Sequence, residues 1–80
     1  MSHVWHMKKF LILSFDIPKE KGALRKRIWR ELTKNGAENK YDSYWILSLS
    51  RSSLKLFTTL RSEILKNGGK AEVIKGEKIA

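Results

Sequence analysis

Residues 9–17 read KFLILSFDI and are the most strongly strand-forming stretch of the chain. The stretch is short, apolar and rich in residues that favour β-structure, and Pro18 ends it. Because the apolar residues follow one another without alternation, we expect a central strand that is paired on both edges and covered on one face. The other predicted elements are placed around this strand.

Two helices are predicted from apolar residues at helical spacing. Leu24, Ile28 and Leu32 recur every four residues and Trp29 widens their stripe, which predicts a helix over 22–35 that stops at Gly36. The hydroxyl groups of residues 50–53 suit a helix start. The second helix then runs to residues 66–67 and presents Leu54, Leu56, Phe57, Leu60 and Ile64.

The aromatic segment between the helices is long enough for two strands, 38–41 and 44–50, with the turn at Asp42-Ser43. One long bent strand is the alternative. A final short strand is expected over 71–75, and 76–80 is expected to be a tail. An internal echo, ELTKNG at 31–36 and EILKNG at 63–68, supports two βαβ halves. The predicted fold is therefore α+β and ferredoxin-like (βαββαβ), a four-stranded antiparallel sheet with both helices on one face.

Eighty residues predict one domain, 7–80, preceded by residues 1–6 as a native arm or an engineered remnant. Cysteine is absent, which excludes disulfides and thiolate metal sites, and both histidines lie in residues 1–6. Tyr41, Tyr44, Trp45 and Phe15 are more aromatic surface than one sheet face leaves in water. We therefore expect a homodimer through the sheet; the alternative is that alternation directs these rings into the core.

The chain carries 17 Lys and Arg against 8 acids, for a formal charge of +9 and a pI near 10.1. Such a charge favours nucleic acid as partner ahead of an anionic membrane, with DNA and RNA both open. No apolar run is long enough to cross a membrane and no signal peptide is recognisable, so a cytoplasmic location without membrane contact is expected. The candidate phosphate-binding cations are Lys19, Lys21, Arg25, Lys26, Arg27, Arg30, Lys34 and Arg51.

Arg27, Arg30 and Lys34 share one helix flank, which is either a phosphate-binding stripe or an ordinary solvated face. Trp29 and Trp45 are candidates for stacking on bases, although the apolar stripe predicts that Trp29 packs in the core or against the partner of a dimer. The sequence has no glycine-rich phosphate loop and no general-base histidine in the body of the domain, so no small-molecule cofactor is expected.

Several of these segments carry a resemblance to known families: FLILSFDIP (10–18), the basic helix LRKRIWREL (24–32), the Gly36-Ala37 step and YDSYWIL (41–47). Together they resemble the amino-terminal domain of the chromate-resistance regulator ChrB. The Phe-Asp-Ile-Pro motif resembles the carboxy-terminal domain of the phenylacetate repressor PaaX. An aspartate after an apolar first strand resembles the small CRISPR adaptation protein, the second CRISPR-associated protein, which forms a homodimer of ferredoxin-like domains.

The resemblance to the CRISPR family implies a role for Asp16. The equivalent aspartates of two subunits would face each other across the dimer axis, hold Mg²⁺ or Mn²⁺ and cleave phosphodiesters, with Ser14, Ser48 and Arg51 as candidate helpers. The alternative for Asp16 is a structural cap on the turn into the first helix. The sequence thus predicts a small basic homodimeric nucleic-acid-binding module. The alternatives are a metal-dependent endonuclease and a protein-interaction module that does not bind nucleic acid.

Overall fold

A computed structural model describes residues 7–40 and 44–79. The predicted arm at 1–6 and Tyr41 therefore lie outside the described residues. The described elements follow the predicted βαββαβ order. They are β1 (Met7–Asp16), α1 (Gly22–Lys34), β2 (Glu38–Lys40), β3 (Tyr44–Ser48), α2 (Arg51–Lys66) and β4 (Lys70–Ile79).

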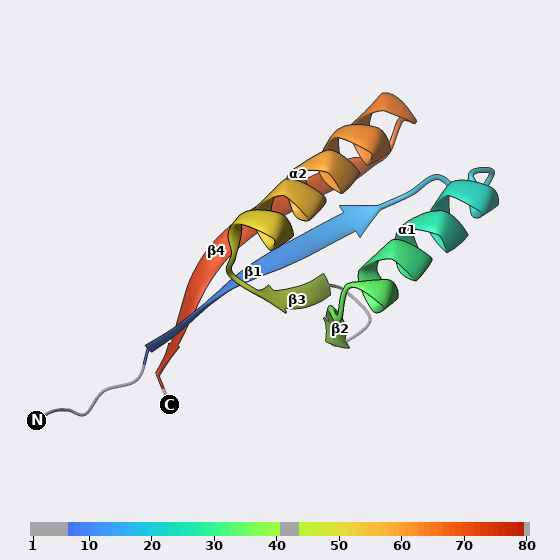
Figure 1. Cartoon of the computed structure of the whole chain (residues 1–80). Coiled ribbons are helices and arrows are strands. Elements are labelled where there is room, and N and C mark those ends of the chain that lie inside the picture. Colours follow the sequence, from blue (N-terminus) through green and yellow to red (C-terminus); the bar gives the residue numbers. More distant parts are fainter. Residues whose placement is uncertain (1–6, 41–43, 80) are drawn as a thin grey trace, which may run out of the picture.

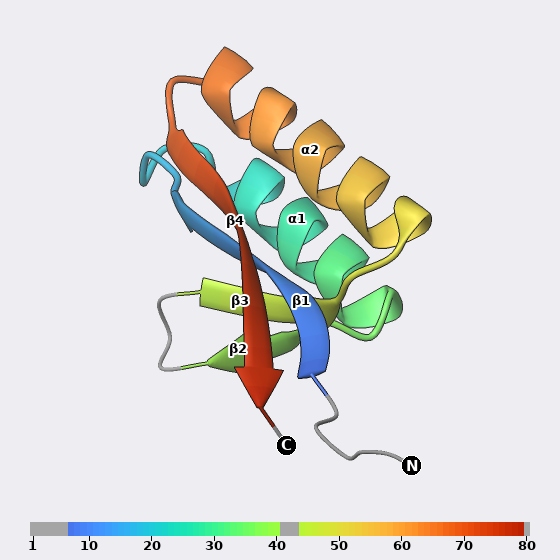
Figure 2. The same cartoon turned by 90° about the vertical axis from the view of Figure 1, so that its left-hand side faces the viewer.

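The sheet has the order β2-β3-β1-β4, and each neighbouring pair is antiparallel (Figure 2). β1 is the inner strand that pairs with both β3 and β4, as its uninterrupted apolar run predicts. β2 and β3 form a hairpin, so the alternative of one long bent strand is wrong. This strand order is that of the ferredoxin-like fold.

Both helices cover the same face of the sheet, and the other face carries no helix (Figures 1 and 2). Alternate residues of β1, Leu11 and Leu13, point toward the helices and are fully buried. They meet the predicted stripe of α1, Leu24, Ile28 and Leu32, and the buried residues of α2 that include Phe57 and Ile64. Burying each of these side chains contributes about 1.5–3 kcal/mol, so the core fixes which face of every element is inside.

β4 continues to Ile79, past the predicted end at Lys75, so the expected tail at 76–80 is strand at least to residue 79. The extension pairs with an equally early start of β1, along the register from Met7↔Ile79 to Asp16↔Lys70. Gly76, the first residue of the expected tail, lies opposite Phe10. A Cβ at Gly76 would lie 2.8 Å from Cε1 of that ring. The phenyl ring thus lies over the glycine backbone, and a larger residue at this position would require the ring to move.

The two copies of the internal repeat, at 31–36 and 63–68, end their helices with the same geometry. Gly36 and Gly68 both have φ of 83°, the left-handed conformation that glycine adopts without strain. The Gly36 amide donates to the Thr33 carbonyl at 3.1 Å, and the Ala37 amide donates to the Leu32 carbonyl at 3.0 Å. The equivalent pair of bonds ends α2, at 3.2 and 2.9 Å. Each Asn-Gly step therefore closes a helix with a Schellman motif.

α2 begins with a capping arrangement made from two serines. The Ser50 hydroxyl accepts from the Ser53 amide at 3.0 Å, and the Ser53 hydroxyl accepts from the Ser50 amide at 2.8 Å. These bonds satisfy amides that the first helical turn leaves unpaired. The hydroxyl-rich segment 50–53 thus starts the helix as predicted.

We expect Gly69→Ala to destabilise the domain by about 1–3 kcal/mol. The added Cβ would lie 2.6 Å from the Asp16 carbonyl oxygen and 2.6 Å from Cγ2 of Ile64, where α2 turns into β4. Urea denaturation followed by circular dichroism, at one protein concentration, measures the change.

Gly22→Ala is the matched control, because nothing lies within 4 Å of its added Cβ and Gly22 opens α1. It should leave the urea midpoint of unfolding unchanged or raise it slightly, since alanine is a better helix former than glycine. Equal midpoints for the two variants would contradict the tight junction at Gly69.

Candidate functional site

Trp29 lies on the surface, so the core position that the apolar stripe predicted for it is wrong. Its exposed fraction is 56%, whereas its neighbours Ile28 and Leu32 are fully buried. One residue along a helix turns the side chain by about 100°, which carries Trp29 off the buried stripe. The structure thus leaves a large aromatic ring in water.

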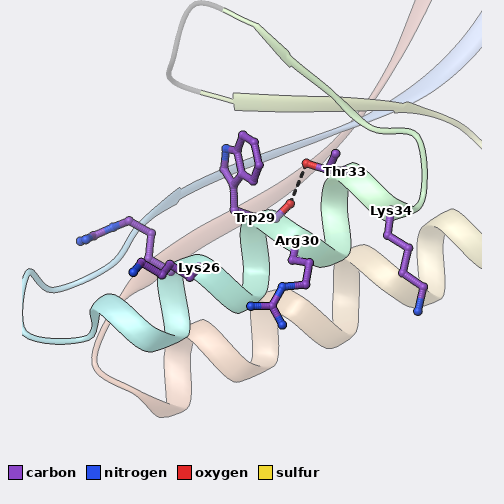
Figure 3. A pocket seen from close by; sticks show the side chains of 6 residues that line it. Lys26, Trp29, Arg30, Thr33 and Lys34 are labelled. Atoms are coloured by element: carbon purple, nitrogen blue, oxygen red, sulfur yellow. Dashed lines mark hydrogen bonds between the residues drawn. The ribbon is translucent and has the colours of Figure 1, made fainter.

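The ring of Trp29 is held against a second tryptophan. It points from α1 toward the β2–β3 hairpin (Figure 3) and meets the ring of Trp45. The two rings are perpendicular, at 85°, with centroids 5.9 Å apart. Trp45 itself is 5% exposed and belongs to the core. Trp45 is therefore a support beneath Trp29, and its predicted place on a dimer face is wrong.

Trp29 lies in a surface hollow of about 580 Å³ whose other walls are mostly cationic. Lys26, Arg30 and Lys34 lie along α1 and line the same hollow, and Figure 3 shows the Arg30 and Lys34 side chains directed away from the Trp29 ring. Because they are spaced four residues apart, they form a row that advances about 6 Å at each step. The remaining lining residues are Arg25 and Thr33. We call Trp29 with Lys26, Arg30 and Lys34 the α1 basic face.

The cations of the α1 basic face are not held by neighbouring side chains of the described residues. Within residues 7–40 and 44–79, no hydrogen bond or ion pair engages the side chain of Lys26, Arg30 or Lys34. The charged ends of these side chains are therefore not taken up by contacts within the described residues.

Neither α1 nor α2 is long and apolar enough to cross a membrane.

Two of the predicted phosphate-binding cations have structural partners instead. The Arg25 guanidinium donates to the carbonyls of Ile17 at 2.9 Å and Pro18 at 3.4 Å, which ties the β1–α1 connection to the helix. The Arg27 guanidinium pairs with the Glu63 carboxylate at 2.6 Å and bridges α1 to α2. Arg27 therefore does not act together with Arg30 and Lys34 as the sequence predicted. The row of cations without partners among the described residues is Lys26, Arg30 and Lys34.

The remaining predicted cations lie beyond the two ends of α1. Lys19 and Lys21 are exposed in the segment that leads into the helix. Arg51 is exposed at the first residue of α2, which starts near the end of α1, since Asn35 and Ser52 line one hollow. The fold therefore extends the positive surface past both ends of the α1 basic face.

Asp16 ends β1 on the face of the sheet that carries no helix, which we call the open face. It is exposed, it lies opposite Lys70, and it lines a hollow with Ser14 and Glu72. Within the described ranges its carboxylate accepts no hydrogen bond, and the N-cap of α1 is Lys21 without a side-chain bond. The capping role considered for Asp16 is therefore not observed.

A metal site is not complete in one copy of the chain. Among residues 7–40 and 44–79, no three or more His, Asp or Glu side chains gather where they could hold an ion. Tight Mg²⁺ binding needs about six oxygen ligands, some of them water. Asp16 would therefore need ligands from outside the subunit.

The open face carries an apolar row that the sequence pattern did not single out. Ile46, Ile12 and Ile74 lie side by side across β3, β1 and β4, and Ile74 is 46% exposed. Phe10 occupies the next position along β1. The alternation that buries Leu11 and Leu13 places these residues on the opposite face. Alternation along β1 was therefore the sequence signal that could have predicted this apolar row.

The aromatic residues expected on this open face are distributed differently. Tyr44 does lie on it, opposite Ser14. Phe15 and Trp45 point to the helix side, where Phe15 packs against the core. The alternative considered for these rings, that strand alternation directs them inward, thus holds for Phe15 and Trp45. Tyr41 lies outside the described residues.

No family model, curated protein or solved structure matches the chain. The resemblance to ChrB, PaaX and the CRISPR adaptation protein stays a prediction.

We expect the two tryptophans to differ sharply in their contribution to stability. Trp29→Ala should cost at most about 1.5 kcal/mol, the value of one aromatic pair, because the ring is largely exposed. Trp45→Ala should cost about 3–5 kcal/mol, because it empties part of the core. Urea denaturation of both variants measures the difference, and similar losses would contradict the surface position of Trp29.

Proposed function

We propose that the protein binds nucleic acid through the α1 basic face. The observation that carries the proposal is an exposed aromatic ring, Trp29, that lines one hollow with three cations whose side chains have no partner within residues 7–40 and 44–79. Cations bind phosphates and aromatic rings stack on bases, and nucleic acid offers both groups at close spacing. A cytoplasmic location, which is the expectation from the sequence, belongs to the same proposal.

The charge of the whole chain supports this partner. A formal charge of +9 on 80 residues attracts polyanions over distances set by the salt concentration. Lys19, Lys21 and Arg51 would extend the contact past both ends of the row. Each phosphate that is neutralised releases counterions, so the affinity should fall steeply as salt rises.

The alternative is a protein-interaction module whose charge serves only solubility. Under that alternative, the cations would have no spatial relation to Trp29. Exposed cations also lie on α2, at Lys55, Arg61 and Lys66, but within the described chain those that line one hollow with an exposed tryptophan are on α1. This arrangement favours a ligand with both anionic and planar groups.

We expect the triple variant Lys26→Gln, Arg30→Gln, Lys34→Gln to bind oligonucleotides more weakly. It should also reduce the slope of log affinity against log salt by about two to three, since each lost phosphate contact removes about 0.7–0.9 of slope. Fluorescence anisotropy with a labelled oligonucleotide across a salt series measures both effects.

The matched control removes the same charge from α2, with Lys55→Gln, Arg61→Gln and Lys66→Gln, all exposed. It should keep most of the slope and affinity. If both triples weaken binding equally, net charge and not the α1 basic face governs the interaction.

We further propose that the open face pairs with a second copy of the chain. Its centre is the apolar row Ile46, Ile12 and Ile74 together with Phe10. An exposed, contiguous apolar patch of this kind marks an interaction surface. Two such sheets can pack face to face, with strands aligned to within about 30°.

Charges at the edges of the open face make it complementary to itself. Lys40, Tyr44, Ser14 and Glu72 form one row across the four strands, with Lys40 at the β2 edge and Glu72 at the β4 edge. A two-fold axis parallel to the strands, between β3 and β1, sets each β2 edge over the β4 edge of the other copy. Lys40 of one copy then meets Glu72 of the other, twice in each dimer.

We expect Ile74→Asp to abolish this dimer, and Lys40→Glu to weaken it by about tenfold through like-charge contacts. The double variant Lys40→Glu, Glu72→Lys should restore the dimer, because the two signs are exchanged together. Sedimentation equilibrium over a concentration series measures the dissociation constants.

Leu54→Asp, on the exposed side of α2, is the control and should not change association. A monomeric wild-type protein at high concentration would exclude the homodimer. Failure of the double variant to recover would exclude this axis.

Metal-dependent phosphodiester cleavage is the second candidate function. The observation that favours it is the carboxylate of Asp16 on the open face, which has no partner among the described residues and lines the same hollow as Glu72. The proposed axis runs beside β1, so the Asp16 residues of two copies would approach each other. Together they could supply carboxylate oxygens to Mg²⁺ or Mn²⁺, which would activate water.

Under this second function, Asp16→Asn should reduce cleavage of labelled RNA and DNA by about a hundredfold or more, with binding retained. Glu20→Gln, an exposed acid outside the open face, is the matched control and should cleave like the parent. Gel analysis with Mg²⁺, Mn²⁺ or a chelator provides the measurement. Cleavage that persists in Asp16→Asn would assign the activity elsewhere.

A further inference from the structure

We infer that the nucleic acid bound at the α1 basic face is single-stranded, and that one of its bases stacks on Trp29. The inference rests on the proposed function and adds the class of ligand and the role of the ring. It starts from a ring that is 56% exposed and yet packed against a buried partner.

The contact with Trp45 leaves Trp29 able to stack. In a perpendicular pair, one ring presents its edge to the face of the other. If Trp29 presents its edge, Trp45 covers neither of its faces; if Trp45 presents its edge, Trp45 covers only one. At least one face of the Trp29 indole is therefore left uncovered by Trp45, while the contact limits the motion of the ring.

The backbone beneath the ring is also held. The Thr33 hydroxyl donates to the Trp29 carbonyl at 2.9 Å, one turn further along α1 (Figure 3). The helix thus positions the indole and the row of Lys26, Arg30 and Lys34 in one rigid element. A stacking platform beside a cationic track is the arrangement that binds single strands with little regard to sequence.

A duplex fits this surface less well than a single strand does. Its bases are already stacked on one another, and it offers a side chain only base edges and phosphates. Inserting the indole between base pairs would cost a few kcal/mol of unstacking for each step. A single strand has free base faces, so the same phosphate contacts come with stacking in addition.

The test compares a ten-nucleotide thymidine oligomer, a ten-nucleotide adenosine oligomer and the duplex of the two, at one salt concentration. Wild-type protein should bind each single strand at least about tenfold more tightly than the duplex. Trp29→Leu should lose about tenfold or more on single strands, and Trp29→Tyr should retain most of the affinity. The duplex affinity should change little in either variant.

A further readout and a control variant separate stacking from general damage. Tryptophan emission of the wild type should be quenched by the adenosine oligomer, and Trp29→Leu should lose that quenching. Leu54→Ala, an exposed apolar residue on α2, is the control and should bind like the wild type.

The outcomes distinguish a failure of this inference from a failure of the proposed function on which it rests. Equal affinity for duplex and single strands, unchanged in Trp29→Leu but reduced in the Lys26, Arg30 and Lys34 triple variant, would overturn the stacking role and leave nucleic-acid binding standing. No binding to any oligomer would overturn both. Displacement of the oligomers by an equal concentration of polyglutamate would show an acidic-peptide site and would also overturn the inference.

Discussion

Alternation along β1 is the constraint on which the rest of the structure depends. The strand is apolar on both of its faces, of which one packs under the helices and the other lies on the open face of the sheet. Leu11 and Leu13 are buried beneath the helices, whereas Ile12 faces away from them beside Ile46 and Ile74. A shift of one residue would exchange these two sets. The buried set holds the domain together, and the other set leaves an apolar surface to be covered.

The same principle divides the surface of α1 into three parts. Leu24, Ile28 and Leu32 are buried, and Arg27 pairs with Glu63 to bind the two helices together. On the third part, Trp29 is exposed and lines one hollow with cations that have no partner among the described residues. Packing therefore accounts for two sides of the helix and leaves the third exposed. The proposed function is assigned to that third side.

Both proposed surfaces lie on one small unit, and their positions are compatible. The α1 basic face is on the helix side of the domain, and the open face is on the opposite side of the sheet (Figures 1 and 2). A dimer through the open face would bury neither Trp29 nor its flanking cations. It would present two α1 basic faces on opposite sides, which doubles the number of contacts available to one long strand.

By itself, the sequence determined the order of elements, the antiparallel four-stranded sheet and the places where the helices stop. Apolar periodicity, Ser50 and the two Asn-Gly steps act through neighbours a few residues away, so local pattern is sufficient to predict them. Tertiary structure alone decided that Trp29 is outside and Trp45 inside. It also decided that Arg25 and Arg27 have partners, whereas Lys26, Arg30 and Lys34 have none in the part of the chain that the structure describes. It also extended β4 past Gly76, where the Phe10 ring fills the space. These features depend on which segments meet across the fold, and contacts between distant residues are not encoded in any local pattern.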